Sequence, residues 1–425
     1  MNDFLYRAAI AAALPLVHAV APFNERVRRG VDGRRASLAS LQAWSAASRD
    51  RTRPLVWLHA PSVGEALMAQ AILAVVRERA PDVQAIFTFF SPSAERMAER
   101  VGADWHGYLP WDAPGPVRAA LDAVEPDAVA FVRTEIWPEL VRQAKRRGAG
   151  VVLVNAVLGA GSSRTGRAAR TLLGNAYAAL DEVGAVSDDD ASRFPRLGVP
   201  RAQIRVTGDA RFDQVCARID QLDRSQPLLR ALAGRNGPCL VAGSTWPADE
   251  AALLGTNALA GWRSIIAPHE PTAAHVEALE ARVRAAGATC ARLPAMDSGD
   301  VPDVDVLVVD RVGVLADLYA VADAAYVGGG FGTSGLHSVA EPAALGVPVV
   351  YGPRHGNAQE AARLADAGGG FIVEEPLSLA DTLRALRDDV AARSDAGVAA
   401  RVFVEAQRGG AAGGAEVILR HLRRH

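Results

Sequence analysis

Lysine is almost absent from this 425-residue sequence: Lys145 is the only one, so arginine supplies nearly all of the positive charge. Basic and acidic residues number 46 and 48, and the formal net charge is −2. A chain with this balance has no overall attraction to nucleic acid. We therefore expect no nucleic-acid partner. Clustered arginines nevertheless suit phosphate groups, because the planar guanidinium can bind them bidentately.

Cysteine is also scarce, and Cys216, Cys239 and Cys290 are odd in number and widely spaced. They form neither a CxxC site nor a disulfide framework, which indicates a reducing compartment. The nine histidines lack the spacing of a metal site. There is no GxxxxGK[ST] sequence and no acidic pair typical of a Mg²⁺ anchor, which argues against phosphoryl transfer from ATP. We expect no metal and no cofactor.

One long apolar run lies near the N-terminus, between Arg7 and Glu25, and is broken by Pro15 and His18. A signal peptide has more positive charge before its apolar part, whereas here Asp3 offsets Arg7. The run is marginal for a spanning helix, which needs about 20 apolar residues. A basic flank that suits anionic head groups on a cytoplasmic face follows it. The pattern favours an uncleaved membrane-associating helix at the cytoplasmic side of the inner membrane; a plain buried first helix is the alternative. The flanking arginines are Arg26, Arg28, Arg29, Arg34 and Arg35.

The length of the chain predicts two domains. From Pro54 onward, short apolar strands alternate with helices, which is typical of βαβ units and a parallel sheet. The strand signal pauses around 213–235, and a second alternating series starts at Cys239. We expect an N-terminal membrane-associating helix and flank (1–45), a first Rossmann-like domain (46–215) and a second one (216–425). The tail from Val398 is weakly helical and interrupted by glycines at 409–414; packing of its last helix on the first domain is left open.

The stretch Tyr326–Gln359 combines a strand, a glycine-rich loop and an expected helix from about Leu336. Glycines at 328, 329, 330 and 332 permit sharp turns and close approach of the backbone to a ligand. A helix N-terminus then offers N–H groups to a phosphate. Glu341 precedes Pro342, which removes a hydrogen bond from a helix, and we expect this glutamate to bind hydroxyls such as those of a ribose. An ordinary strand–helix turn is the alternative.

Two carboxylates follow strands of the first domain. Glu65 lies near a helix start after the strand LVWLHA, and Glu135 follows the strand 128–132. Ligands bind at this edge of a doubly wound sheet, and a carboxylate there can act as a general base. Both residues also suit helix capping, since Ser62 and Glu65 have the spacing of a capping box.

Eight motifs in one order are similar to those of the 3-deoxy-D-manno-octulosonic acid (Kdo) transferases of Gram-negative lipopolysaccharide assembly. The resemblance covers most of the chain, from about Val56 to Phe371. The motifs are WLHAPSVGE (57–65), LPWD (109–112), TEIWP (134–138), VLVNAVL (152–158), VTGDARFD (206–213), AGST (242–245), APHEP (267–271) and GGGF…H..AEPAALGVPVVYGP (328–353).

The resemblance implies a GT-B fold, with two Rossmann-like domains facing across a cleft. It implies an inverting glycosyltransferase that moves Kdo from CMP-Kdo to the lipid A precursor (lipid IVA) at the inner membrane, without a metal. Glu65 matches the family's catalytic base, and Glu135 is the second catalytic candidate. Positions in the second domain match a donor site. The expected donor-binding residues are Ser244, Pro268, His269, Val312, Gly313, Val314, Gly329, Gly330, Ser338, Glu341 and Asn357.

Three residues depart from the family's pattern. His269 stands where many members have arginine, Ser338 where asparagine is frequent, and Arg133 where a further glutamate is frequent. Two other functions stay open at this point. One is another GT-B enzyme, a UDP-sugar transferase or an epimerase, and the other is a non-catalytic glycolipid-binding protein.

Overall fold

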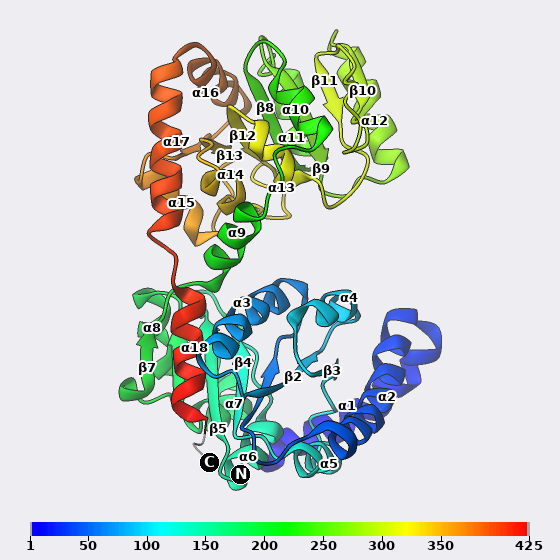
Figure 1. Cartoon of the computed structure of the whole chain (residues 1–425), viewed down its shortest axis with the longest axis vertical. Coiled ribbons are helices and arrows are strands. Elements are labelled where there is room, and N and C mark those ends of the chain that lie inside the picture. The colour runs from blue at the N-terminus through cyan, green and yellow to red at the C-terminus, as the bar shows by residue number, and fades with distance from the viewer. Residues whose placement is uncertain (1, 423–425) are drawn as a thin grey trace. The chain divides into compact units, whose positions relative to one another are not determined.

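The computed structural model describes residues 2–422, which divide into two compact units (Figure 1). The first unit contains the chain up to Gln214 together with the segment from Gln407, and the second runs from Val215 to Ala406. Each unit is built around a seven-stranded parallel sheet, as the alternation of strands and helices predicts.

The sheet of the first unit has the strand order β3-β2-β1-β4-β5-β6-β7. Its central strands β1 and β4 are buried at every position, in agreement with their unbroken apolar sequences. From β1 the chain continues to β2 and β3 on one side of β1, and it then adds β4 on the other side. The strand order therefore reverses between β1 and β4. Such a reversal is where ligands bind in doubly wound sheets. The strands are β1 Leu55–His59, β2 Gln84–Phe89, β3 Trp105–Tyr108, β4 Ala128–Val132, β5 Gly150–Ala156, β6 Glu182–Ala185 and β7 Ile204–Val206.

Helices cover both faces of this sheet. One apolar core contains residues of α2, α5, α6 and α7, and the other contains residues of α3 and α18. The helices are α1 Asn2–Val20, α2 Glu25–Ser48, α3 Val63–Arg79, α4 Glu95–Ala98, α5 Pro114–Val124, α6 Pro138–Arg146, α7 Arg167–Ala178, α8 Asp188–Arg193, α9 Ala210–Asp220 at the boundary of the units, and α18 Gly410–His421. Short 3₁₀ helices span Ala21–Phe23, Pro92–Ala94, Glu99–Val101, Ser163–Thr165, Phe194–Leu197 and Arg201–Gln203.

The C-terminal helix α18 packs on α3 and β5 of the first unit. Its glycines were expected to interrupt a helix, but α18 begins at Gly410 and includes two more of them. A Cβ atom on Gly410 would lie 2.4 Å from the backbone of Asp209, and one on Gly413 would lie 2.5 Å from that of Thr207. The missing side chains therefore allow a close approach that outweighs the low helix propensity of glycine.

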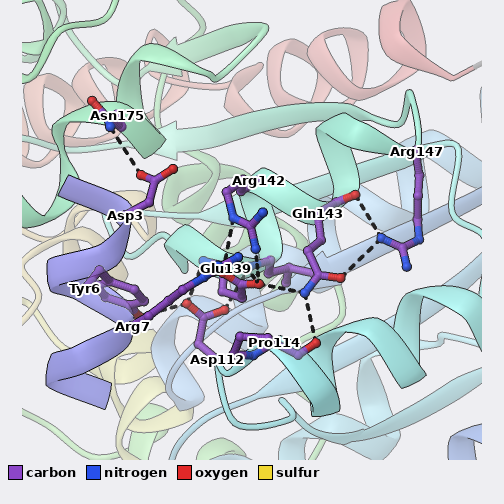
Figure 2. A network of polar contacts seen from close by, with 11 residues as sticks. Asp3, Tyr6, Arg7, Asp112, Pro114, Glu139, Arg142, Gln143, Arg147 and Asn175 are labelled. Carbon is purple, nitrogen blue, oxygen red and sulfur yellow. Dashed lines mark hydrogen bonds and ion pairs between the residues drawn. The ribbon is translucent and has the colours of Figure 1, made fainter. Parts of the chain in front are cut away.

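Helix α1 is fastened to the first unit by buried and partly buried polar contacts near its start. Figure 2 shows Tyr6 and Arg7 reaching toward Asp112 and Glu139. The Tyr6 hydroxyl donates to Asp112 Oδ2 at 2.8 Å, and Arg7 Nε lies 3.0 Å from Glu139 Oε2. The segment from residue 3 to 23 is long and apolar enough to cross a membrane, and almost none of it is buried. The helix thus combines a fixed start with an exposed apolar surface.

The sheet of the second unit has the order β10-β11-β9-β8-β12-β13-β14, and it reverses between β8 and β12. Its strands are β8 Cys239–Thr245, β9 Arg263–Pro268, β10 Cys290–Arg292, β11 Val306–Val308, β12 Ala324–Val327, β13 Val349–Tyr351 and β14 Gly370–Ile372. Its helices are α10 Pro227–Ala233, α11 Pro247–Gly255, α12 Ala273–Ala285, α13 Leu315–Leu318, α14 Ala340–Ala344, α15 Gln359–Asp366, α16 Pro376–Asp388 and α17 Val390–Glu405, with a 3₁₀ helix at Tyr319–Val321.

The prediction of a helix from Leu336 was wrong, because α14 begins only at Ala340 and contains five residues. Pro342 therefore lies in the first turn of α14, where backbone N–H groups have no partner within the helix. The proline removes no helical hydrogen bond there, so its place after Glu341 causes no conflict.

Candidate active site

Glu65 lies in the first turn of α3, directly after β1 at the carboxyl edge of the first sheet. The Ser62 hydroxyl contacts the Glu65 carboxylate itself, and it makes no side-chain cap of the helix. The capping box that the spacing allows is therefore not formed. The carboxylate is half-buried, so it combines a fixed position with access to solvent.

Glu135 lies in the loop between β4 and α6. Strand β4 pairs with β1, the strand that precedes Glu65. The N-cap of α6 is Trp137, so Glu135 does not cap that helix. Burial raises the pKa of Glu135, the charge of Arg164 opposes this shift, and the negative charge of Glu65 adds to it. Because each carboxylate acts on the other electrostatically, the fold brings these two predicted catalytic residues into one site.

His59, at the end of β1, links the two carboxylate loops. Its Nε2 accepts from the indole Nε1 of Trp137 at 3.0 Å, and its Nδ1 lies 3.1 Å from Thr88 Oγ1. Indole can only donate, so Nε2 is unprotonated and the neutral ring carries its proton on Nδ1. Burial lowers the pKa of His59 to about 3. Both His59 and Trp137 lie in family motifs, but the sequence contains no sign that they are hydrogen-bonded to each other.

Two arginines lie in this part of the first unit, and sequence reasoning missed Arg164, the one that acts on Glu135. Arg164 interacts with Glu135, and among the described residues its buried Nε has no hydrogen-bond partner. Arg133 has a φ of 78°, and its guanidinium lies 3.8 Å from Asp209. Burial alone would raise the pKa of Asp209, but the charges of Arg211 and Arg133 lower it overall. Arg133, which stands where a further glutamate is frequent in the family, therefore forms an ion pair with Asp209 here.

In the second unit, the glycine loop after β12 packs against the chain's own backbone. A Cβ atom on Gly329 would lie 2.0 Å from Gly335 O, and one on Gly330 would lie 2.6 Å from Gly352 N. The buried Asp249 holds this loop, because its carboxylate accepts from Gly329 N at 2.9 Å and from the Tyr326 hydroxyl at 2.7 Å. The glycines are thus required for packing of the loop itself, and Asp249 is an organising residue that the sequence did not reveal.

Three rings stack at the carboxyl ends of β8 and β9. The His269 ring lies 4.2 Å from that of His337 and 4.8 Å from that of Trp246, measured between centroids. Trp246 Nε1 donates to His337 Nε2 at 3.1 Å, so the neutral His337 is protonated on Nδ1. Burial, with a contribution from His269, lowers the pKa of His337. His269, whose ring is the nearest neighbour of both other rings, is itself exposed and accessible to solvent.

Arg218 of α9 is a cation close to Glu341, and its Nη1 lies 3.7 Å from the Glu341 carboxylate. Burial raises the pKa of Glu341, and the charge of Arg218 opposes the shift. Arg218 also donates to Gly313 O at 3.4 Å, so it joins the 312–314 loop to Glu341. Asn357 uses both ends of its amide on the backbone of Leu336, at 2.9 and 2.8 Å. The amide of Asn357 therefore positions the loop.

The remaining donor-binding candidates lie around the same sheet edge. Ser244 has a φ of 53° at the end of β8, and Pro268 ends β9, the strand next to it. Val312 is 78% exposed, and Ser338 is exposed before α14. Val314 is the N-cap of α13. Across residues 2–422, no three His, Cys, Asp or Glu side chains are grouped so as to hold a metal ion.

Comparisons with known proteins agree with this architecture. Residues 34–214 match the family described as 3-deoxy-D-manno-octulosonic-acid transferase (kdotransferase). The Bordetella pertussis protein of that name is 31% identical over 83% of this chain and 84% of its own length. The Haemophilus influenzae one is 26% identical over 77% of both chains.

Among solved structures, the UDP-GlcNAc 2-epimerase of Neisseria meningitidis, bound to UDP-GlcNAc, superimposes with a TM-score of 0.61. The match covers 86% of this chain and 99% of the epimerase at 12% identity. At that identity the likeness concerns the fold alone. Together with the two seven-stranded α/β units, it confirms the predicted GT-B fold class.

Proposed function

This chain belongs to the 3-deoxy-D-manno-octulosonic acid transferase family, and from that premise we propose its substrates, its catalytic groups and its attachment to the membrane. The observation that carries the function is the 31% identity to the Bordetella transferase over most of both chains. The protein is a glycosyltransferase that transfers Kdo in lipopolysaccharide biosynthesis.

The proposed donor is CMP-Kdo and the proposed acceptor is a lipid A precursor such as lipid IVA. We assign acceptor activation to the first unit and donor binding to the second. The pair of carboxylates supports the first assignment. The stacked rings, Glu341 and the loops that end β8, β9 and β12 support the second.

In the proposed reaction, Glu65 takes the proton of an acceptor hydroxyl as the oxygen attacks the anomeric carbon of Kdo. A carbon–oxygen bond forms there, and the bond to the CMP phosphate breaks with its electron pair leaving on the phosphate oxygen. Attack opposite to the leaving group inverts the anomeric centre. Glu65 is supported as the base by its access to solvent. Burial raises the pKa of Glu135 beside it, which favours the neutral form of that second carboxyl.

The charge of the departing CMP needs stabilisation, and the reaction we propose uses no metal ion. Backbone N–H groups after β8 and β9 lie near the starts of α11 and α12, where helix dipoles favour anions. Preorganised donors of this kind contribute about 3 kcal/mol each to transition-state stabilisation.

For the membrane, we propose that α1 lies along the surface and does not cross the bilayer. The contacts of Tyr6 with Asp112 and of Arg7 with Glu139 support this, because a spanning helix would have to break them. Phe4 and Phe23 are 75% and 90% exposed and are available to lipid. The proposed side of the inner membrane is the cytoplasmic one.

The test is a transfer assay with CMP-Kdo and tetraacylated lipid A precursor, followed by mass spectrometry of the product. Wild-type protein should add the mass of Kdo, and Glu65→Gln should lower kcat by about 10² to 10⁴ while CMP binding stays unchanged. Glu78→Gln, which changes an exposed carboxylate at the other end of α3, controls for a general effect of removing a carboxylate. Near-normal turnover by Glu65→Gln would remove Glu65 from the role, and transfer from a UDP-sugar in place of CMP-Kdo would overturn the donor.

A further inference from the structure

A cavity of about 470 Å³ lies in the first unit, between α1, α2 and the turn after β2. Its walls include Leu16 and Val20 of α1, Val27 of α2, and the rings of Phe90 and Trp111. The volume falls within the roughly 300–1,000 Å³ typical of small-molecule sites. Its apolar walls suit a hydrocarbon chain and are poorly suited to a sugar or a nucleotide.

Arg34 also lines the cavity, and only 5% of its surface is exposed. Its guanidinium lies between the rings of Phe90 and Trp111, at 4.3 and 4.4 Å from their centroids. Two of its nitrogens donate to the carbonyls of Gly30 and Phe90. Its buried Nε has no acceptor within the part of the chain that the structure describes. Because Arg34 lines the cavity, it places a cation in an otherwise apolar wall. A fitting ligand therefore carries an oxygen acceptor beside its apolar chain, as an acyl ester or amide does.

The cavity adjoins the two carboxylates through two short connections. Phe90 stacks on Trp137, two residues after Glu135, with 5.1 Å between ring centroids. Ser91, in the cavity wall, donates its backbone N–H to Pro61 O at 2.9 Å, in the turn that leads to Glu65. A ligand in the cavity therefore lies one layer of side chains away from the proposed site of acceptor activation.

The rim of the cavity is basic. Arg26 forms part of its wall and donates to Ser91 Oγ at 3.3 Å. Arg28 is exposed on the same turn of α2, outside the cavity wall, and Arg29 on that turn is paired with Glu95. Positive charge at the mouth of an apolar cavity complements a lipid whose head group is anionic.

We propose that this cavity, which we call the acyl pocket, holds one fatty acyl chain of the anionic glycolipid acceptor while the sugar of that lipid meets Glu65. The inference rests on the proposed function and specifies how the acceptor is recognised. The chain fills the space between α1 and α2, and its ester or amide oxygen accepts from Arg34.

The test compares kcat/KM for tetraacylated lipid A precursor with kcat/KM for the fully deacylated sugar, using the full chain and saturating CMP-Kdo. Val20→Trp on α1 and Val27→Trp on α2 each fill the pocket from a different helix. In both variants the ratio of acylated to deacylated kcat/KM should fall at least tenfold, since each methylene kept out of the pocket is worth about fourfold. Ala36→Trp, at an exposed position of α2, should leave the ratio unchanged.

An unchanged ratio in both pocket variants would overturn the acyl pocket, while absence of transfer by the wild type to either acceptor would overturn the proposed function. A second measurement needs no turnover. A dibrominated fatty acid quenches a tryptophan that it touches, so Trp111→Phe should remove at least half of the quenching seen with the wild type. Equal fractional quenching in the two proteins would contradict the pocket, even for variants that are inactive in transfer.

Discussion

The burial of His59 makes the first unit sensitive to acid. In the folded chain its pKa is about 3, against 6.5 for an unperturbed histidine, so the unfolded chain binds its proton first as the pH falls. The stability that neutral His59 contributes is therefore complete above pH 6.5 and is lost progressively toward pH 3. The slope is at most about 1.4 kcal/mol per pH unit for one group.

We therefore expect His59→Gln to flatten the acid dependence of unfolding. Between pH 6.5 and 4.5, the wild type should lose about 2 kcal/mol more than the variant. Urea unfolding followed by tryptophan fluorescence measures this, since five of the seven tryptophans lie in the first unit. His106→Gln, at an exposed position of β3, should run parallel to the wild type. Parallel curves for His59→Gln as well would show that His59 is not held neutral.

Glu341 is the residue of the proposed donor site whose loss should affect CMP binding most directly. Its carboxylate is held near Arg218, and a hydrogen bond from a ribose hydroxyl to a charged group is worth about 1.5–3 kcal/mol. Glu341→Ala should thus weaken CMP binding by about 10- to 100-fold, as measured by calorimetry. Glu374→Ala, at an exposed position after β14, should not change the affinity. Unchanged CMP affinity in Glu341→Ala would refute its placement in the donor site.

Among single residues, the sequence identified those whose place in a motif can be recognised. Glu65 and Glu135 were found because each follows an apolar strand at the ligand-binding edge. His59, Arg164 and Asp249 were missed because their roles consist of contacts with residues distant in sequence, such as the hydrogen bond from Trp137. No local pattern records such a contact.

At the scale of elements, helix α1 supports a prediction about membrane binding. Phe4 and Phe23 are exposed, and burying such a side chain in lipid is worth about 1.5–3 kcal/mol. The double variant Phe4→Ser, Phe23→Ser keeps the contacts of Tyr6 and Arg7. It should bind vesicles of phosphatidylethanolamine and phosphatidylglycerol at least tenfold more weakly in a sedimentation assay.

The matched control for α1 lies in the second unit, where Val398 and Val402 of α17 are each 61% exposed. The double variant Val398→Ser, Val402→Ser removes a comparable exposed apolar surface and should bind vesicles like the wild type. Equal loss in the two double variants would mean that binding is not located on α1.

Strand β4 and helix α14 show what the sequence could and could not place. Strand β4 spans Ala128–Val132 as expected, because a five-residue apolar run between helices has no other stable place in a doubly wound sheet. The helix expected from Leu336 was wrong because Asp249 and Asn357 hold the preceding loop by its backbone. Those hydrogen bonds compete with helix formation and come from other parts of the chain.

For the whole molecule, the C-terminal helix α18 completes the core of the first unit. Val417 and Ile418 are fully buried there, among residues of α3 and of β1, β4 and β5. Ile418→Ala should destabilise the first unit by about 2–5 kcal/mol, although the residue lies only a few positions from the end of the chain. The shift in the urea midpoint of tryptophan fluorescence measures this change.

Val402→Ala is the matched control, because Val402 belongs to α17 of the second unit and is exposed. Its effect should stay within about 0.5 kcal/mol. If Ile418→Ala behaved like this control, α18 would not contribute to the core of the first unit.

The sequence by itself determined that this chain forms two parallel α/β units, that it carries the family's motifs in order, and which two glutamates follow the strands of the first sheet. Apolar runs and motif order are local properties, and they can be read without coordinates. Only the tertiary structure decided that His59 joins the two glutamate loops, that α18 returns to the first unit, and that a cavity containing Arg34 lies between α1 and α2. These features depend on packing between segments far apart in the chain, where a contact is set by shape and burial and leaves no spacing pattern in the sequence.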